Sequence, residues 1–159
     1  MKGFGIFVVL FASSVFAAWA QLPVADSVLS LHSFRFIGLA FLVPGVVSPD
    51  LPSAFTHSAA YGDIIAAILA LLALISLPTA SGIVIAWIFS LWGTADLFNA
   101  FYQANHAGLT AGQLGSTYFI PTFIVPLLLI THGLGFRILL RRENESVMRE
   151  GRQASIRHR

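Results

Sequence analysis

Long apolar runs alternate with short turn-forming segments along most of this chain. A helix that crosses a membrane needs about 20 mostly apolar residues. Five segments approach that length, namely residues 4–20, 31–47, 59–77, 82–102 and 118–140. Segments rich in proline, glycine and serine separate them, as at residues 48–52 and 78–81. The pattern therefore predicts an all-α integral membrane bundle with about five transmembrane helices.

Three prolines fall inside these apolar segments. Pro44 lies in the second segment, and Pro121 and Pro126 lie in the fifth. Each proline removes a backbone donor and crowds the preceding helical turn. We therefore expect kinks in these two helices.

Charged residues make up only 10% of the 159 residues, and most of them lie near the C-terminus. Between Gly3 and Phe136, the Lys, Arg, Asp and Glu residues are Asp26, Arg35, Asp50, Asp63 and Asp96. So few charges cannot give a water-soluble fold its polar surface, whereas a surface that faces lipid needs none. The composition excludes an ordinary soluble domain and favours a single membrane domain.

Arginine is concentrated after the last apolar segment, and we expect residues 141–159 to form a basic tail. By the positive-inside rule this tail is cytoplasmic, which predicts a multi-pass protein of the cell inner (plasma) membrane. The tail either lies on anionic headgroups or is a disordered topology anchor. We read its charge as a topology signal and expect no nucleic-acid partner.

The first segment has two interpretations. Lys2, the apolar run and Ala18-Trp19-Ala20 also resemble a cleavable signal peptide. Five retained spans place the basic tail inside, whereas four spans after cleavage place it outside. We therefore favour five retained spans.

Small residues recur at four-residue spacing in the third and fourth segments, at Gly62, Ala66 and Ala70 and at Ala86, Ser90 and Thr94. Small side chains let helices approach closely in lipid. We expect these two faces to contact partner helices.

Acidic residues within spans are the best candidates for function, because a charge at the centre of a bilayer costs about 2.5 kcal/mol or more. Asp96 shares a helical face with three polar or amphipathic residues, and Asp63 is close to a tyrosine and a histidine. We predict an outward-facing pocket whose ligand-binding residues are Asp63, Asp96, Asn99, Trp92, Tyr61, His57 and Gln103, flanked by His106. The alternative is a purely structural set of polar contacts between helices.

Arg35 is expected near the inner end of the second helix, where it contacts a lipid phosphate or another anion. His32 and His132 lie in the same half of the membrane and could approach it. A buried ion pair between Arg35 and an aspartate is the alternative, but it needs a shift of more than two helical turns.

The sequence contains no cysteine, which excludes disulfides, thiolate metal sites and cysteine nucleophiles. It also has no phosphate-binding loop, dinucleotide-binding turn or serine-nucleophile motif. His57 with His106, or His32 with His132, could stand at one depth as haem ligands do, but neither pair has a spacing motif. We expect no catalytic residue, metal or cofactor.

Several short motifs suggest a family. They are residues 34–42 (FRFIGLAFL), 51–55 (LPSAF), 61–63 (YGD) and 92–97 (WGTADL), followed by Pro121, Pro126 and His132. They resemble small uncharacterised bacterial multi-span membrane proteins, and the layout is loosely similar to DoxX-like four-helix proteins. The resemblance covers about residues 31–140 and implies a compact helical bundle without an assigned activity.

We therefore expect a non-enzymatic membrane protein that binds or translocates a small molecule, lipid or proton through the pocket at Asp63 and Asp96. One alternative is an accessory or assembly subunit of a larger membrane complex. A second is a membrane enzyme that acts on a lipid or quinone with an Asp–His acid–base set. Expected partners are membrane lipid and either further copies of the chain or a larger complex.

Overall fold

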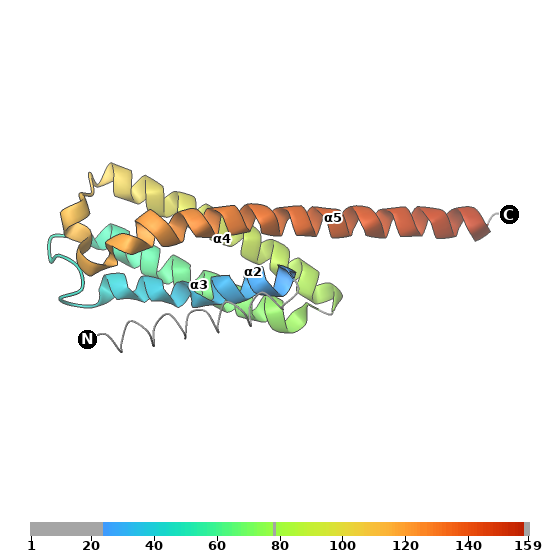
Figure 1. Cartoon of the computed structure of the whole chain (residues 1–159), viewed down its shortest axis with the longest axis horizontal. Coiled ribbons are helices and arrows are strands. Elements are labelled where there is room, and N and C mark those ends of the chain that lie inside the picture. Colours follow the sequence, from blue (N-terminus) through green and yellow to red (C-terminus); the bar gives the residue numbers. More distant parts are fainter. Residues whose placement is uncertain (1–23, 78, 158–159) are drawn as a thin grey trace, which may run out of the picture.

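The fold is a helical bundle, and the computed structural model describes residues 24–77 and 79–157 (Figure 1). Within these ranges there is no β-strand. The elements are α2 (Val24–Ser33), the 3₁₀ helix η1 (Phe34–Leu42), α3 (Ser53–Ser76), α4 (Ala80–His106), the 3₁₀ helix η2 (Ala111–Tyr118), the π-helix η3 (Ile120–Ile124) and α5 (Val125–Arg157). The span expected at residues 4–20 lies outside the described residues.

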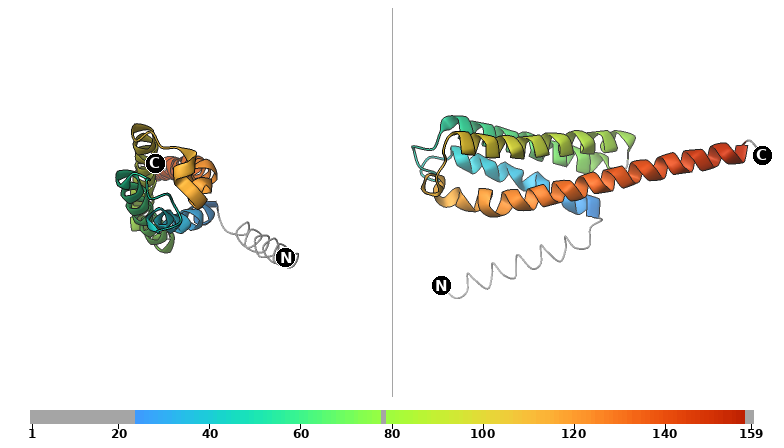
Figure 2. Two further views of the ribbon diagram at one scale, coloured as in Figure 1. Left: turned by 90° about the vertical axis from the view of Figure 1, so that its left-hand side faces the viewer. Right: turned by 90° about the horizontal axis from the view of Figure 1, so that it is seen from above.

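Among the described residues, four stretches are long and apolar enough to cross a membrane: Val24–Leu42, Ser53–Ser76, Ala80–His106 and Ile120–Ser146. They run up and down beside one another, so α2 begins at the same end as the turn between α3 and α4 (Figures 1 and 2). η2 and η3 lie at the opposite end. α5 crosses the whole bundle and continues beyond it.

The second span differs from the expected residues 31–47, because it begins at Val24 and ends at Leu42. Val28, Leu29 and His32 are buried at helical spacing, so the core begins before residue 31. Residues 43–47 instead form a turn that contains Gly45 at a φ of 82°. Pro44 lies in this turn and does not kink a span, contrary to expectation.

The third and fifth spans also begin differently from expectation. α3 starts at Ser53 and not at residue 59, because Phe55 and Thr56 already face the core. Pro121 and Pro126 lie in η3 and in the first turn of α5. Proline removes a backbone donor from the helix, and the distortion at this point is the π-helix that leads directly into α5.

The described part of the expected tail is helical, since α5 continues to Arg157. Its arginines and glutamates are strong helix formers, and Glu145 precedes Arg149 by one turn. These residues therefore form a helix and not the disordered anchor that was one of the two expectations from the sequence.

The loops at the end away from the α5 extension are tied together by backbone contacts. Ser48 N donates to Gln113 O at 3.0 Å, and Ser116 N donates to Val46 O at 3.1 Å. Gly115, at a φ of 53°, allows this approach because a Cβ there would lie 2.5 Å from Val46 O. These contacts hold η2 over the end of the bundle.

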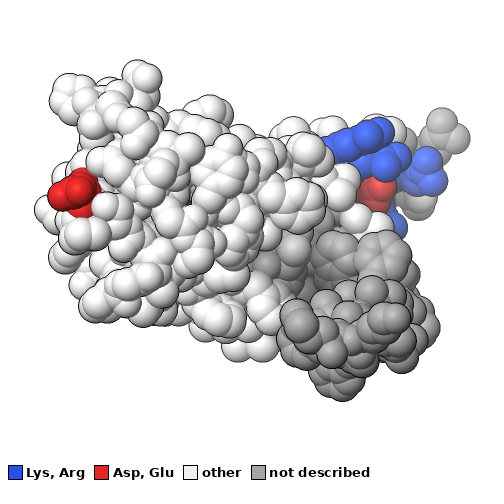
Figure 3. All heavy atoms as spheres, turned by 60° about the vertical axis from the view of Figure 1, so that its left-hand side comes forward, with Lys and Arg blue, Asp and Glu red and all other residues white. Residues whose placement is uncertain are grey.

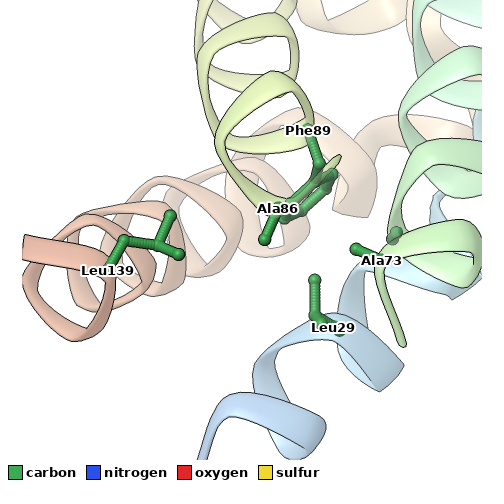
Figure 4. Packing of buried hydrophobic residues seen from close by; sticks show 6 residues of the cluster. Leu29, Ala73, Ala86, Phe89 and Leu139 are labelled. Carbon is green, nitrogen blue, oxygen red and sulfur yellow. The ribbon is translucent and has the colours of Figure 1, made fainter. Parts of the chain in front are cut away.

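The bundle is held together by small residues on α3 and α4, as the sequence predicts. Ala66 and Ala70 are fully buried, and Ala86 and Ser90 are nearly so. Thr94 is only partly buried. Near the α3–α4 turn, larger side chains from α2, α4 and α5 fill the core beside these small residues, as Figure 4 shows for Leu29, Phe89 and Leu139.

The outer surface of the bundle is apolar. Ile75, Phe123 and Ile130 are 74%, 66% and 71% exposed. One broad face carries charged side chains only towards its two ends (Figure 3). Such continuous apolar exposure exceeds what a soluble monomer normally presents and matches a surface that faces lipid.

Candidate functional site

Arg35 lies at the centre of the bundle, where it is 2% exposed. Its Nε donates to Asp63 Oδ1 at 2.7 Å, and its Nη2 donates to Asp96 Oδ2 at 2.6 Å and lies 2.6 Å from Asp63 Oδ1. Its Nη1 donates to Gly93 O at 3.3 Å and is 3.5 Å from His132 Nε2. Each of the three guanidinium nitrogens therefore has an acceptor.

This cluster corrects the expectation that Arg35 contacts a lipid phosphate or another anion. Arg35 follows α2, which is already helical at Val24, and so it stands deep in the bundle. Asp63 is also deeper than expected, because α3 begins at Ser53. The two early helix starts supply the shift that direct pairing requires. The buried ion pair is thus the correct alternative.

Glycines on three elements make room for the cluster. A Cβ at Gly38 would lie 2.8 Å from Asp63 Cβ, and a Cβ at Gly93 would lie 2.5 Å from His132 Nε2. A Cβ at Gly62 would overlap the Asp96 carboxylate. η1, α3 and α4 can therefore approach closely enough for one guanidinium to contact both acids.

His32 and His132 form the other side of the cluster, near Arg35 as the sequence suggests. Their ring centroids are 4.1 Å apart, and each ring also packs on Phe89 at 5.0 Å. Both side chains are essentially fully buried. Together with Phe89 they fill the bundle next to Arg35.

The contacts of the two histidines indicate which ring nitrogens carry protons. Thr131 Oγ1 donates to the carbonyl of the preceding turn, so it accepts from His32 Nε2 at 2.9 Å. His132 Nε2 faces an arginine donor and can accept only when the imidazole is neutral. The protons then lie on Nε2 of His32 and on Nδ1 of His132. Neither Nδ1 has a hydrogen-bond partner among the described residues.

A cavity of about 400 Å³ lies on the carboxylate side of Arg35. Asp63 and Asp96 line it, and almost all of its other lining is apolar or aromatic, including Phe41, Phe101 and Tyr118. η2 and η3 contribute to its wall, so it lies towards the end of the bundle away from the α5 extension. The cavity thus combines an apolar wall with two convergent acids.

The remaining residues predicted for the pocket do not line this cavity. Tyr61 is 55% exposed and Trp92 is 44% exposed, and His57 packs near Tyr61. Asn99 donates to Ser58 Oγ at 2.6 Å on the outside of the bundle. The other two, Gln103 and His106, are partly buried and exposed respectively.

The position of the inward face of α4 explains this difference. The helical face predicted from the sequence contains Trp92, Asp96, Asn99 and Gln103. Asp96 lies at the edge of the buried face of α4, so the rest of the predicted face points away from the cavity. The cavity is instead lined by Leu97, Ala100 and Ala104. An apolar face gives no signal of ligand binding in the sequence, so these residues could not be singled out. Gly38 and Gly93 were missed for the same reason.

Comparison with known proteins places most of the chain in one family. No curated protein and no solved structure matches it, and the DoxX-like resemblance therefore finds no support. Residues 2–140 match a family described as a domain of unknown function, DUF8737. This match includes the arginine, both aspartates and both histidines of the buried cluster. The chain therefore belongs to the DUF8737 family.

Proposed function

We propose that this chain is a multi-pass protein of the cell inner membrane that binds a small molecule in the cavity at Asp63 and Asp96. The arginines of α5 favour a cytoplasmic C-terminus by the positive-inside rule. The cavity lies towards the other end of the bundle, which is the outer end in this orientation.

The observation that carries this proposal is the cavity itself. Pockets for small molecules typically enclose about 300–1,000 Å³, have mostly apolar walls and carry a few polar groups that orient the ligand. This cavity has about 400 Å³, apolar walls and two carboxylates. A purely structural ion pair would not need an open volume beside it.

Binding is the first step of the proposed function, and translocation would require a rearrangement. Beyond the carboxylates the bundle is filled by Arg35, His32, His132 and Phe89, each no more than 2% exposed. A molecule or proton that crosses the membrane through the bundle must displace or pass this cluster.

The enzyme alternative receives less support from the geometry. It requires an aspartate and a histidine that exchange protons at a substrate. Here different nitrogens of the Arg35 guanidinium face the carboxylates and His132, and neither histidine lines the cavity. The acids and the histidines therefore do not face a common substrate position.

A pocket-filling substitution tests the proposal. Ala100 lines the cavity, whereas Ala95 on the same helix is exposed. Wild-type protein, Ala100→Trp and Ala95→Trp are purified in mild detergent, and the small molecules that copurify are identified by mass spectrometry. We expect a species that wild type and Ala95→Trp retain and Ala100→Trp loses. Identical profiles for all three proteins would contradict the proposal.

A further inference from the structure

We propose that the cavity selects an amphipathic monocation, meaning a protonated amine on an apolar body whose charge completes the Asp63–Arg35–Asp96 cluster. This inference rests on the proposed function and names the chemical class of its ligand. It follows from the charge, the free oxygens and the lining of the site.

The first step is the balance of formal charge. Two carboxylates contribute two negative charges, and the Arg35 guanidinium contributes one positive charge, which leaves one negative charge. No other Lys, Arg, Asp or Glu is found among the described residues that line the cavity. His132 Nε2 faces Arg35, and His32 Nε2 bonds to Thr131. With both acids ionised and both histidines neutral, the cluster therefore has a formal charge of one negative unit.

The second step is the use of the carboxylate oxygens. Arg35 occupies Oδ1 of Asp63 and Oδ2 of Asp96. The other two oxygens do not bond to Arg35: Oδ2 of Asp63 faces Gly38, and Oδ1 of Asp96 faces Gly62. Both residues are only 9% exposed, and both line the cavity. An ammonium group has several N–H donors and can bond to these two acceptors.

The third step is the surroundings of these oxygens. An unbalanced charge inside a membrane protein is costly, and an opposite charge placed beside it recovers much of that cost. The aromatic rings of Phe41, Phe55, Phe101 and Tyr118 line the same cavity. They would cover the apolar body of a ligand and can also face its cationic group. A neutral ligand leaves the charge unbalanced, and an anion adds to it.

Three probes with nearly the same skeleton isolate the charge of the ligand. Phenethylamine, phenethyl alcohol and phenylacetate are cationic, neutral and anionic at neutral pH. Their affinities are measured by titration calorimetry on the full chain in an uncharged maltoside detergent. We expect phenethylamine to bind at least about tenfold more tightly than phenethyl alcohol, and phenylacetate to bind most weakly.

Two matched variants connect this selectivity to the site. Asp96→Asn removes one acid from the cluster, whereas Asp50→Asn removes an exposed acid in the loop before α3. Asp96→Asn should reduce the preference for the amine to about that of an uncharged site, and Asp50→Asn should leave it unchanged. Asp63→Asn provides a second test if Asp96→Asn does not fold, and wild-type selectivity can be measured without either variant.

The possible failures are distinguishable. Equal binding of all three probes to wild type, with loss of binding in Ala100→Trp, would overturn the charge selectivity and leave the proposed pocket intact. The same conclusion would follow if Asp96→Asn and Asp63→Asn kept the full preference for the amine. If no probe bound more tightly to wild type than to Ala100→Trp, both this inference and the proposed function would be overturned.

Discussion

At the scale of single residues, the most consequential side chain is Arg35. A buried guanidinium is tolerated only when its donors are satisfied, and here two carboxylates, a carbonyl and an imidazole accept from it. These acceptors come from α3, α4 and α5. One residue of η1 therefore connects three other elements of the bundle.

Replacing Arg35 alone should destabilise the bundle strongly. Arg35→Met leaves two carboxylates close together without a cation, and breaking a buried pair in this way typically costs about 3–5 kcal/mol. Adding Asp63→Asn and Asp96→Asn should restore much of the stability, because it removes the unpaired charges. Thermal unfolding in detergent measures the order of stability of the three proteins. Wild-type stability of Arg35→Met would show that the cluster does not hold the helices.

At the scale of elements, the approach of η1, α3 and α4 depends on positions without a side chain. Gly38, Gly62 and Gly93 each face an atom of the cluster at a distance that leaves no room for a Cβ. Ala66 and Ala70 continue the same close packing along α3. In lipid, where the hydrophobic effect does not drive helices together, such close contact is a main source of association.

Two glycine substitutions should therefore have opposite effects. Gly38→Ala places a methyl group against Asp63 Cβ, an atom whose position is fixed by the backbone. Overpacking of this kind costs about 1–3 kcal/mol of stability. Gly133→Ala on α5 meets no atom within 4 Å and should be neutral or slightly stabilising, because alanine favours a helix. Thermal unfolding of both variants in the same detergent tests this. Equal effects would contradict the role of close packing at Gly38.

At the scale of the whole molecule, charge and loops divide the bundle into two different ends. The arginine-rich extension of α5 projects from one end. The other end carries the loop with Asp50, which is bonded to η2 through Gln113 Nε2 and the Asp50 carbonyl at 3.2 Å. Between them lies an apolar girdle that suits a bilayer. The proposed orientation places the arginine-rich extension of α5 in the cytoplasm and the Asp50 loop outside.

Single cysteines introduced into this cysteine-free chain test the orientation. Asp50→Cys should react with a membrane-impermeant maleimide on intact cells, whereas Met148→Cys on α5 should react only after permeabilisation. Phe98→Cys serves as the control. The Phe98 side chain is 60% exposed on the apolar surface of α4, and in the proposed membrane location a cysteine there should stay unreactive. The reverse pattern for Asp50→Cys and Met148→Cys would place the C-terminus outside.

The hydrophobic pattern alone determined that the chain is an all-α bundle with several helices able to span a membrane. It did so because a lipid environment allows few charges and requires long apolar helices, and both features are local properties of the sequence. The same scarcity of charge identified Asp63, Asp96 and Arg35 as the residues to examine. The expected spans also put His32 and His132 in the same half of the membrane as Arg35.

Only the tertiary structure decided which of these residues meet and what surrounds them. The pairing of Arg35 with both acids depends on where α2 and α3 begin, and helix ends are the least certain feature of a hydrophobic pattern. The cavity depends on the rotation of α4 and on the π-helix before α5, which set which apolar side chains face inward. Apolar residues look alike in a sequence whether they face lipid, core or cavity, so the wall of the site could be located only in three dimensions.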